Sequence, residues 1–532
     1  MAVTWKNRIT EGWRDSRNGA EERKLLLLCF AGVFGFGLAA HAYGFLHAGF
    51  SHDMLNALVA DHLETYWKMQ LGRPGIVLYR RIIRGVIAAP WQLGLLSLLW
   101  LSLSCFLTAK LFRVKSSVFP VLLAGILTVN ITTVAMTATY LYEMDADLVA
   151  VLLGVCAVFL WDRYGWPGVL LGALLTACCM GTYQSMVSVP VTLVMLLSIA
   201  ALLRGETFGE VFRKGLRALL MLGCGALLYW LGVRLMCSIK GINLAMDNYN
   251  SVGQEASASL LGRIGRVYQT WAWAFWNPTH AHIEPLVQVL NCLLAAFGLW
   301  GLISWLVKGK PGGKEKLLLC LLLLLLPVGM NTAQLSFSGD VHDLMKFSFW
   351  LFEVLCLLPA FLLPQEKSSG VVRGLGAVLV LVLLCANIQT ANIVYTKKYL
   401  EQEATQSLMT RVLMRLEEQE DYVPGETPLI FAGVSDQLRE KIPGFEAYYD
   451  ITGCETASPI VKSTASYNYN IYAAYFRYLL NNPAVMADWE LWNRMQEDPR
   501  VTELPTYPAD GCMQLVDGVM VVRMGEDRND RA

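Results

Sequence analysis

Residues 317–328 read LLLCLLLLLLPV, and residues 25–40 read LLLLCFAGVFGFGLAA. Neither run contains a charged residue, and each lies within a longer apolar segment. Over the 532 residues, 55% are hydrophobic and 16% are charged, whereas a soluble domain has roughly 25% charged residues. The sequence therefore predicts a polytopic α-helical membrane protein.

Bulk charge points to no class of partner, nucleic acid included, because 43 basic and 43 acidic residues balance. The first 24 residues are polar and basic, and no small-residue cleavage site follows the first apolar run, which argues against a cleaved signal peptide. Eleven of the 13 cysteines lie in or beside apolar segments, where Cys behaves as a small hydrophobe. Cys454 and Cys512 lie in the polar C-terminal part and are either paired or free.

Apolar segments near the roughly 20 residues needed to cross a bilayer recur eleven times. They span approximately residues 25–44, 92–110, 117–139, 147–161, 166–181, 186–203, 216–236, 285–307, 316–330, 346–364 and 371–394. Lys and Arg gather before the first span and after every second one, so these loops are expected to face the cytoplasm. Eleven spans then place the N-terminus inside and the C-terminus outside.

The chain is expected to divide into three parts. Residues 1–24 form a basic cytoplasmic N-terminus, residues 25–394 form the transmembrane domain, and residues 395–532 form a small extracytoplasmic α/β domain. Outer loop one, residues 45–91, is too long for a turn, and its helical spacing predicts two interfacial helices.

The C-terminal part carries signals of both helix and strand. Residues 401–419 and 468–480 have helical spacing, and residues 428–432 read as a short buried strand. Residues 515–522 predict a hairpin, whose Asp-Gly pair supplies the positive φ angles of a type I′ turn. The sequence shows no nucleophile elbow, P-loop or metal-ligand run in this part.

Carboxylates gather in the predicted outer loops. Asp53 follows the first span, and Asp61 and Glu64 follow it at spacings that let all three face one cleft. A partly desolvated carboxylate has a raised pKa and is a better base. The competing interpretation makes Asp53 the N-cap of the following helix.

Arg73 lies in the turn Gly72-Arg73-Pro74-Gly75 of the same loop. A guanidinium group is planar and matches a phosphate, so Arg73 is a candidate phosphate ligand. Arg80, Arg81 and Arg84 follow, and for these we expect contact with lipid headgroups.

Glu143, Asp145 and Asp147 lie close together in outer loop two. Three neighbouring anions repel, so they favour an Arg, a shared proton or a divalent metal between them. The alternative is a solvated loop in which Asp145 or Asp147 caps the next span.

Further candidates lie at the outer ends of later spans. Tyr183 and Gln184 either hydrogen-bond a sugar or anchor the helix at the interface. Asp340, His342 and Lys346 lie where span ten begins. An unperturbed His titrates near neutrality, although a lone His in a loop is more often solvated. Lys346, just inside the boundary, is placed to meet a phosphate.

These features together resemble the type II Gtr glucosyltransferases, polytopic enzymes similar to the GT-C superfamily, over residues 25–395. The resemblance implies inverting transfer of a sugar, often glucose, from undecaprenyl phosphate to a surface glycan such as O-antigen or teichoic acid, outside a bacterial cell. GT-C enzymes keep a catalytic acid in the first outer loop, where Asp53 matches. The family often has two adjacent acids, whereas His52 precedes a single Asp53 here, so the base is open between Asp53 and Asp61.

The expected function is therefore a membrane glycosyltransferase with Asp53 as base and Arg73, with Lys346, on the lipid phosphate. Glu143, Asp145 and Asp147 then shape the sugar pocket or hold a divalent cation. Two alternatives are a transporter or flippase of lipid-linked sugars and a non-catalytic scaffold for wall assembly. The acidic residues lie in the predicted outer loops, and the spans carry almost no charge. This distribution favours the enzyme, because transporters place polar groups near the bilayer midplane.

Overall fold

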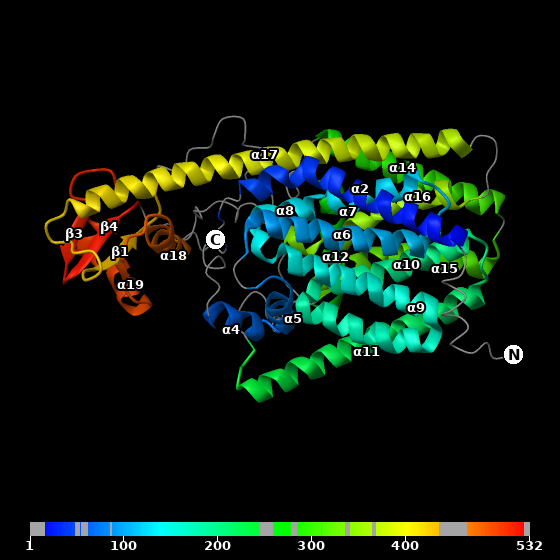
Figure 1. The fold of residues 1–532 in the computed structure, drawn as a ribbon, viewed down its shortest axis with the longest axis horizontal. Coiled ribbons are helices and arrows are strands. Elements are labelled where there is room, and N and C mark those ends of the chain that lie inside the picture. The colour runs from blue at the N-terminus through cyan, green and yellow to red at the C-terminus, as the bar shows by residue number, and fades with distance from the viewer. Residues whose placement is uncertain are drawn as a thin grey trace. The chain divides into compact units, whose positions relative to one another are not determined.

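The computed structural model describes residues 16–47, 50, 54, 62–85, 88–244, 259–277, 285–309, 311–335, 341–363, 369–435 and 465–525. Its helices and strands are labelled in Figure 1. Contacts group the chain into two compact units. Unit 1 comprises residues 1–42, 65–134 and 143–391, and unit 2 comprises residues 43–64, 135–142 and 392–532.

The chain is mostly helical, as expected of a polytopic membrane protein. Its longer helices are α2 (Ser16–Leu46), α4 (His62–Gln70), α6 (Pro90–Phe112), α7 (Val118–Thr128), α8 (Ile131–Thr139), α9 (Leu141–Thr182), α10 (Ser188–Leu203), α11 (Phe208–Lys240), α12 (Leu260–Trp276), α14 (Pro285–Lys308), α15 (Gly313–Met330), α16 (Leu351–Leu362) and α17 (Ser369–Glu417). Short helical segments join them, namely α5 (Pro74–Tyr79), η1 (Arg80–Arg84), η2 (Gln184–Val187), η3 (Ala333–Leu335), η4 (Asp343–Met345) and η5 (Phe347–Trp350).

Among the described residues, seven helices are long and apolar enough to cross a membrane, or eight if the bent pair α7 and α8 forms one span. Each of the eleven predicted segments overlaps a helix. Two of them lie in α9, which is broken at Gly165 by a φ of 61° and a ψ of −130°. The number of spans and their orientation remain predictions.

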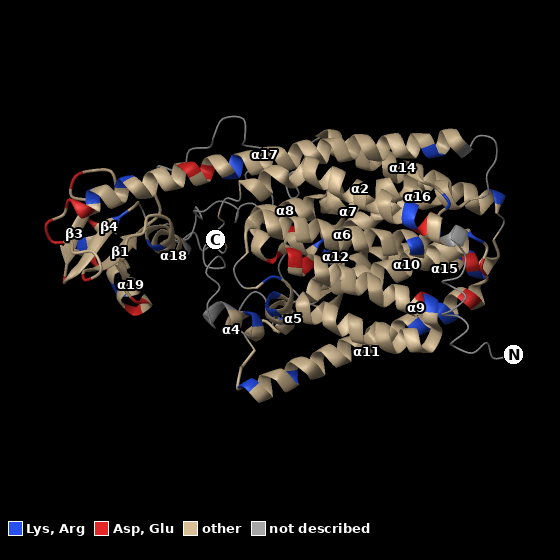
Figure 2. Cartoon of the chain, in the orientation of Figure 1, with Lys and Arg blue, Asp and Glu red and all other residues tan. Residues whose placement is uncertain are grey.

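Most turns of α6, α10, α14 and α15 carry no charged side chain, whereas α9 and α17 carry charges within their length, as Figure 2 shows. Along the apolar stretches, neighbouring helices are held together by close packing. Gly298 and Gly301 of α14 lie against Cys356 and Pro359 of α16, where an added Cβ on Gly298 would come within 2.7 Å of the Cys356 Cα. Small residues at such contacts let two apolar helices approach closely, which favours association in lipid.

Outer loop one, in which two helices were predicted, holds α4, α5 and the π-helical segment η1. Two other predicted loops contain helix that was not expected. The segment predicted as outer loop two, residues 140–146, instead begins α9 at Leu141. The long loop predicted at residues 237–284 contains α12.

Unit 2 contains a four-stranded sheet with the order β2-β1-β4-β3, formed by β1 (Pro428–Ala432), β2 (Val485–Met486), β3 (Met513–Val516) and β4 (Val519–Arg523). β1 runs parallel to β2 and β4, and β3 and β4 form the predicted hairpin. Its turn residues Asp517 and Gly518 have φ angles of 50° and 80°, as a type I′ turn requires.

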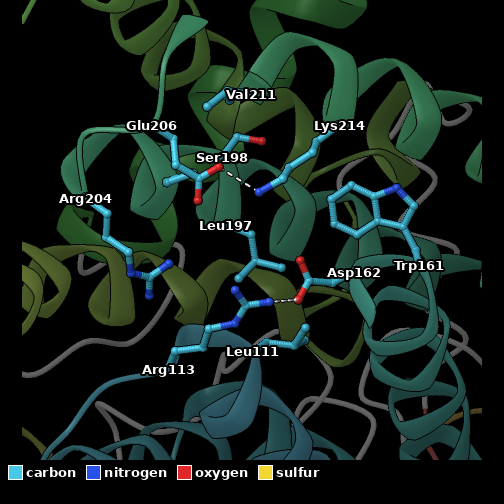
Figure 3. Close-up of a pocket in the computed structure, with 11 residues that line it drawn as sticks. Leu111, Arg113, Trp161, Asp162, Leu197, Ser198, Arg204, Glu206, Val211 and Lys214 are labelled. Atoms are coloured by element: carbon cyan, nitrogen blue, oxygen red, sulfur yellow. Dashed lines mark hydrogen bonds and ion pairs between the residues drawn. The ribbon is translucent and has the colours of Figure 1, made fainter. Parts of the chain in front are cut away.

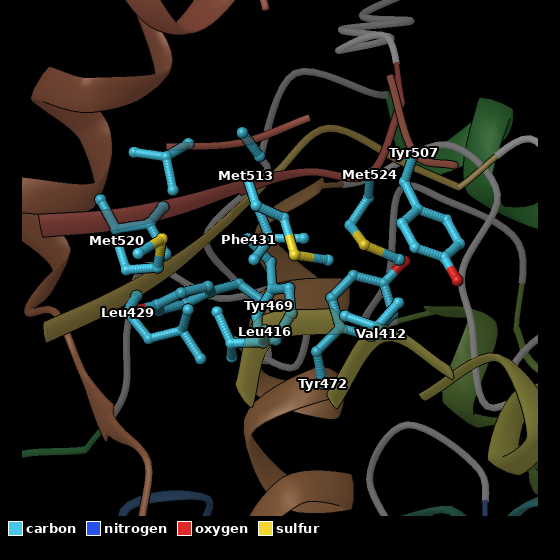
Figure 4. Packing of buried hydrophobic residues seen from close by; sticks show 14 of the residues in the cluster. Val412, Leu416, Leu429, Phe431, Tyr469, Tyr472, Tyr507, Met513, Met520 and Met524 are labelled. Carbon is cyan, nitrogen blue, oxygen red and sulfur yellow. The ribbon is translucent and has the colours of Figure 1, made fainter. Parts of the chain in front are cut away.

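Helices pack against this sheet. Besides the end of α17 they are α18 (Ala465–Ala474), the π-helical η8 (Tyr475–Leu479), α19 (Trp489–Gln496) and α20 (Pro499–Thr502). One hydrophobic core contains Val412 and Leu416 of α17, Tyr472 of α18 and Phe431 of β1 (Figure 4). Phe476 of η8 is buried in the same core.

The structure bears on two predictions about the C-terminal part, the domain boundary and the state of its cysteines. The boundary predicted between residues 394 and 395 falls inside the continuous helix α17. Cys512 is buried and pairs with no described cysteine, and Cys454 lies outside the described residues.

Candidate active site

Three acidic side chains open α9 and are buried there. Glu143, Asp145 and Asp147 expose 6%, 0% and 4% of their surface. They belong to the first two turns of a helix, so the expected solvated loop capped by Asp145 or Asp147 is wrong. Buried carboxylates need compensating charge or hydrogen bonds, and outer loop one supplies cations.

Glu143 is held by two of these cations. Lys68 Nζ of α4 forms an ion pair with Glu143 Oε1, and Arg80 Nη2 of η1 lies 3.5 Å from the same oxygen. All three side chains are buried. These ion pairs tie α4 and η1 to the start of α9.

Asp145 has a partner of its own. Arg84 Nε lies 2.8 Å from Asp145 Oδ2. The Tyr79 hydroxyl lies beside the same carboxylate and accepts a hydrogen bond of 2.9 Å from Trp100 Nε1. Burial first, and the charge of Asp145 second, raise the pKa of Tyr79, so its phenol stays protonated.

These pairs correct the expected role of the loop-one arginines. Arg80 and Arg84 neutralise α9 carboxylates instead of facing lipid headgroups. Arg81 between them is exposed. The two paired arginines are four residues apart, a spacing that brings side chains to one face of a helical segment.

The Gly72-Arg73 turn is fixed by two polar side chains from distant helices. Gln184 Nε2 donates to the Leu71 carbonyl at 2.6 Å and to the Tyr229 hydroxyl at 3.0 Å. Tyr229 in turn donates to the Gly72 carbonyl at 3.1 Å. Gly72 has a φ of 70°, and a Cβ there would lie 2.9 Å from the Tyr229 hydroxyl.

Arg73 is oriented by both members of the predicted Tyr183-Gln184 pair. Its Nε donates to Gln184 Oε1 at 3.0 Å, and its guanidinium carbon lies 4.6 Å from the centre of the Tyr183 ring. The two terminal Nη groups make no hydrogen bond or ion pair within the described part of the chain. A half-buried, oriented guanidinium with free terminal donors is suited to an anionic ligand.

Asp147 is the carboxylate that no cation pairs within the described residues. It lies one helical turn after Glu143 and within electrostatic range of both Arg73 and Lys68. Lys68, Arg73, Arg80 and Arg84 of loop one therefore lie around the three carboxylates of α9.

Across the residues that the structure describes, no three His, Cys, Asp or Glu side chains converge as metal ligands. Of the three partners considered for these acids, the structure shows basic side chains, because Lys68 and Arg80 lie beside Glu143 and Arg84 lies beside Asp145.

Lys346 belongs to a different ion pair. Its Nζ lies 2.6 Å from Asp343 Oδ1, and the Asp343 carbonyl accepts a 2.8 Å hydrogen bond from Thr132. Burial lowers the pKa of neighbouring His342, which favours its neutral form. Lys346 is thus already neutralised by Asp343, so its expected phosphate contact would have to compete with a buried carboxylate.

The proposed bases lie outside this description. Asp53, Asp61 and Asp340 are not among the described residues, and Glu64 lies in α4 with its side chain outside them. The structure therefore joins Arg73, Tyr183 and Gln184 with the α9 acids and leaves the carboxylates of loop one untested.

Sequence reasoning missed three members of the cluster. Lys68 could have been identified, because it is a basic residue in a predicted helix of the same loop as Arg73. No sequence feature distinguished Tyr79 or Tyr229, because a tyrosine next to apolar residues is an ordinary interfacial or packing residue.

Replacing Glu143 with Gln is expected to destabilise the protein by about 3 kcal/mol, because Lys68 and Arg80 then stay buried beside a neutral amide. Thermal unfolding in detergent measures the loss. Combining the change with Lys68→Met should cost less than the sum of the single changes. Glu22→Gln is the matched control, since its ion pair with Lys110 is exposed and contributes about 1 kcal/mol at most. Equal losses for Glu143→Gln and Glu22→Gln would contradict the buried network.

Comparison with known families places this cluster in context. The family model described as Glucosyl transferase GtrII matches residues 42–333. The matched range contains Arg73, Glu143 and Gln184 and ends before Lys346. No curated protein and no solved structure matches the chain. Because the family match covers more than half of the sequence, the chain belongs to the GtrII glucosyl transferase family.

Proposed function

We propose that this protein transfers glucose from a polyprenyl-phosphate donor to a cell-surface glycan, at the outer face of a bacterial membrane and with inversion of the anomeric carbon. Membership of a glucosyl transferase family supports glycosyl transfer to a glycan, and the candidate membrane spans support a membrane location. The lipid donor and the stereochemistry are what the family resemblance implies, and the face of the membrane is inferred from the positive charge of the predicted inner loops.

The observation that carries the proposal is the orientation of Arg73. Its guanidinium is stacked on Tyr183 and bonded to Gln184, and its terminal donors are free within the described residues. A guanidinium held in this way can form two parallel hydrogen bonds to the oxygens of a sugar phosphodiester. An oriented donor pair of this kind costs little reorganisation when charge develops on a leaving group.

The reaction follows from these parts. The oxygen of an acceptor hydroxyl attacks the anomeric carbon, the bond from that carbon to the phosphate oxygen breaks, and the hydroxyl proton passes to Asp53. The departing polyprenyl phosphate goes from one negative charge to two. Arg73 stabilises the added charge through its Nη groups, and Lys346 is a second phosphate ligand only where Asp343 releases it.

Asp147 has a role that differs from that of its two neighbours. Glu143 and Asp145 are engaged by buried cations, whereas Asp147 keeps its oxygens available. A carboxylate accepts hydrogen bonds from adjacent sugar hydroxyls. We therefore assign Asp147 to binding the donor sugar, with the ion pairs of Glu143 and Asp145 fixing the helix that carries it.

The test is a transfer assay with the purified full-length protein, radiolabelled polyprenyl-phosphate glucose and a surface glycan acceptor. We expect labelled glycan and free polyprenyl phosphate in equal amounts, with the opposite anomeric configuration in the product. Flux of donor across proteoliposomes without transfer in detergent would favour a transporter. Retention of configuration at the anomeric carbon would contradict a single displacement in which Asp53 is the general base.

Replacing Gly72 with Ala is expected to lower transfer at least tenfold, because the new Cβ displaces the Tyr229 hydroxyl that holds the Arg73 turn. Gly85→Ala is the matched control: Gly85 also has a positive φ, of 76°, but nothing lies within 4 Å of an added Cβ. Both changes carry backbone strain of about 1–3 kcal/mol. Equal activities of the two variants, measured as initial transfer rates, would show that the turn does not position Arg73.

A further inference from the structure

A second polar site lies at the other end of the first half of α9. Asp162 follows Glu143 by 19 residues in this helix, which at 1.5 Å per residue separates them by about 28 Å. Around Asp162 residues of α6, α9 and α10 and of the beginning of α11 line a small pocket that opens to solvent (Figure 3). Nothing in the proposed transfer reaction uses it.

Cations outnumber acids in this pocket. Its lining includes Arg113, Arg204 and Lys214 together with Asp162 and Glu206, so three minus two leaves one positive charge. Arg113 Nη2 lies 2.5 Å from Asp162 Oδ2, and Lys214 Nζ lies 2.6 Å from Glu206 Oε2. Arg204 is the cation without an acidic partner within the described residues.

In Figure 3 the Arg113 guanidinium is directed toward Asp162, and the Arg204 side chain lies at the edge of the same pocket. Arg204 uses Nη2 to donate to the Phe112 carbonyl at the end of α6, which leaves its other N–H groups available. Burial lowers the pKa of Arg204 and the positive charge of Arg113 lowers it further, while the negative charges of Glu206 and Asp162 offset part of this lowering. An anion between the two guanidinium groups would relieve this repulsion.

The rest of the lining is apolar. Leu111, Leu197, Ala201 and Val211 are buried side chains of the pocket, and the buried Trp161 ring forms one wall. A cationic rim beside an apolar surface suits a ligand with an anionic head and a hydrocarbon tail. The helices that build the pocket are candidate membrane spans, so lipid has access to their ends.

We propose that this pocket binds the phosphodiester headgroup of an anionic phospholipid, with Arg204 and Arg113 on the phosphate. Basic pockets between transmembrane helices are known to select anionic headgroups, and the positive charge of the loops predicts that this end faces the cytoplasm. The site is independent of the transfer reaction at Arg73, because it is built from other residues at the opposite end of the first half of α9.

The experiment measures lipid binding to the detergent-purified full-length protein by native mass spectrometry. The probes are dioleoyl phosphatidylglycerol, dioleoyl phosphatidylcholine and inorganic phosphate. We expect phosphatidylglycerol to bind most tightly, and Arg204→Gln to weaken it about fivefold, as expected for loss of one charge near anionic lipid. Lys115→Gln is the matched control, since Lys115 is exposed in the loop after α6 and outside the pocket. Equal binding of the two lipids, or equal weakening by the two variants, would overturn the proposal.

A second variant separates binding from structural pairing. Asp162→Asn frees Arg113 and adds one positive charge to the pocket, so phosphatidylglycerol should bind more tightly than to the wild type. If the arginines only brace the helices, this change lowers the melting temperature and leaves lipid affinity unchanged, which would contradict a lipid site. Binding of inorganic phosphate as tight as that of the lipid would also contradict it, because the apolar wall would then contribute nothing.

Discussion

Transfer by the Arg73→Gln variant is expected to be about 10²–10³-fold slower than transfer by the wild type, the loss typical of removing one donor from a developing charge. Gln lacks the positive charge and both terminal donors that face the proposed phosphate. The stack on Tyr183 and the bond to Gln184 hold this group in place, so no neighbouring cation takes its position. The loss should fall on kcat more than on KM, because the leaving group gains its second charge only as the bond breaks.

Two variants make this prediction sharp. Arg73→Lys keeps the charge but not the planar pair of donors, so it should recover only part of the rate. Arg81→Gln removes an exposed cation from the same loop. This variant should leave kcat unchanged. Radiolabelled transfer under saturating donor measures all three. A similar loss in Arg73→Gln and Arg81→Gln would indicate a general effect of loop charge.

Replacing Asp53 with Asn is expected to lower the transfer rate by about 10²–10⁴-fold, because an amide cannot take the proton of the acceptor hydroxyl. Asn keeps the size of the side chain and can still cap a helix, so the change removes the base and preserves the competing structural role. Donor binding, measured by titration with polyprenyl-phosphate glucose, should change little.

The comparison with Asp61→Asn decides which of the two acids is the base. In the pH profile of kcat, protonation of the base causes the decline at acidic pH. Only the variant that lacks the base should lose this decline. If neither change affects the rate, proton transfer does not involve loop one, and the non-catalytic scaffold gains support. If both reduce donor binding equally, the two acids shape the sugar pocket together.

Much of the fold could be predicted because lipid imposes a simple rule on sequence. Apolar runs of membrane length, such as residues 25–44, had to be helical, since backbone groups in hydrocarbon have no other partner. The Asp517-Gly518 turn was equally predictable, because few residues accept two positive φ angles in succession. The start of α9 was not, because Glu143 and Asp145 resemble loop residues until their cations are known.

The site was predictable in its members but not in its pairings. Arg73, Tyr183 and Gln184 carried recognisable chemistry, and the structure brings them together. The partner of Glu143 depends on how α4 and η1 fold back onto α9, which no local spacing reveals. Tyr229 lies 157 residues from the Gly72 carbonyl that it binds, so only the packing of α11 identifies it.

The ion pairs between outer loop one and α9 also constrain protein engineering. Swapping either segment alone between relatives would bring together charges that had not been matched to each other, and a buried mismatch is costly. A chimera meant to change sugar or acceptor preference should therefore exchange residues 62–85 together with the opening turns of α9. Exchanges confined to the C-terminal sheet involve none of these ion pairs, but they must preserve the contacts of the sheet with the end of α17.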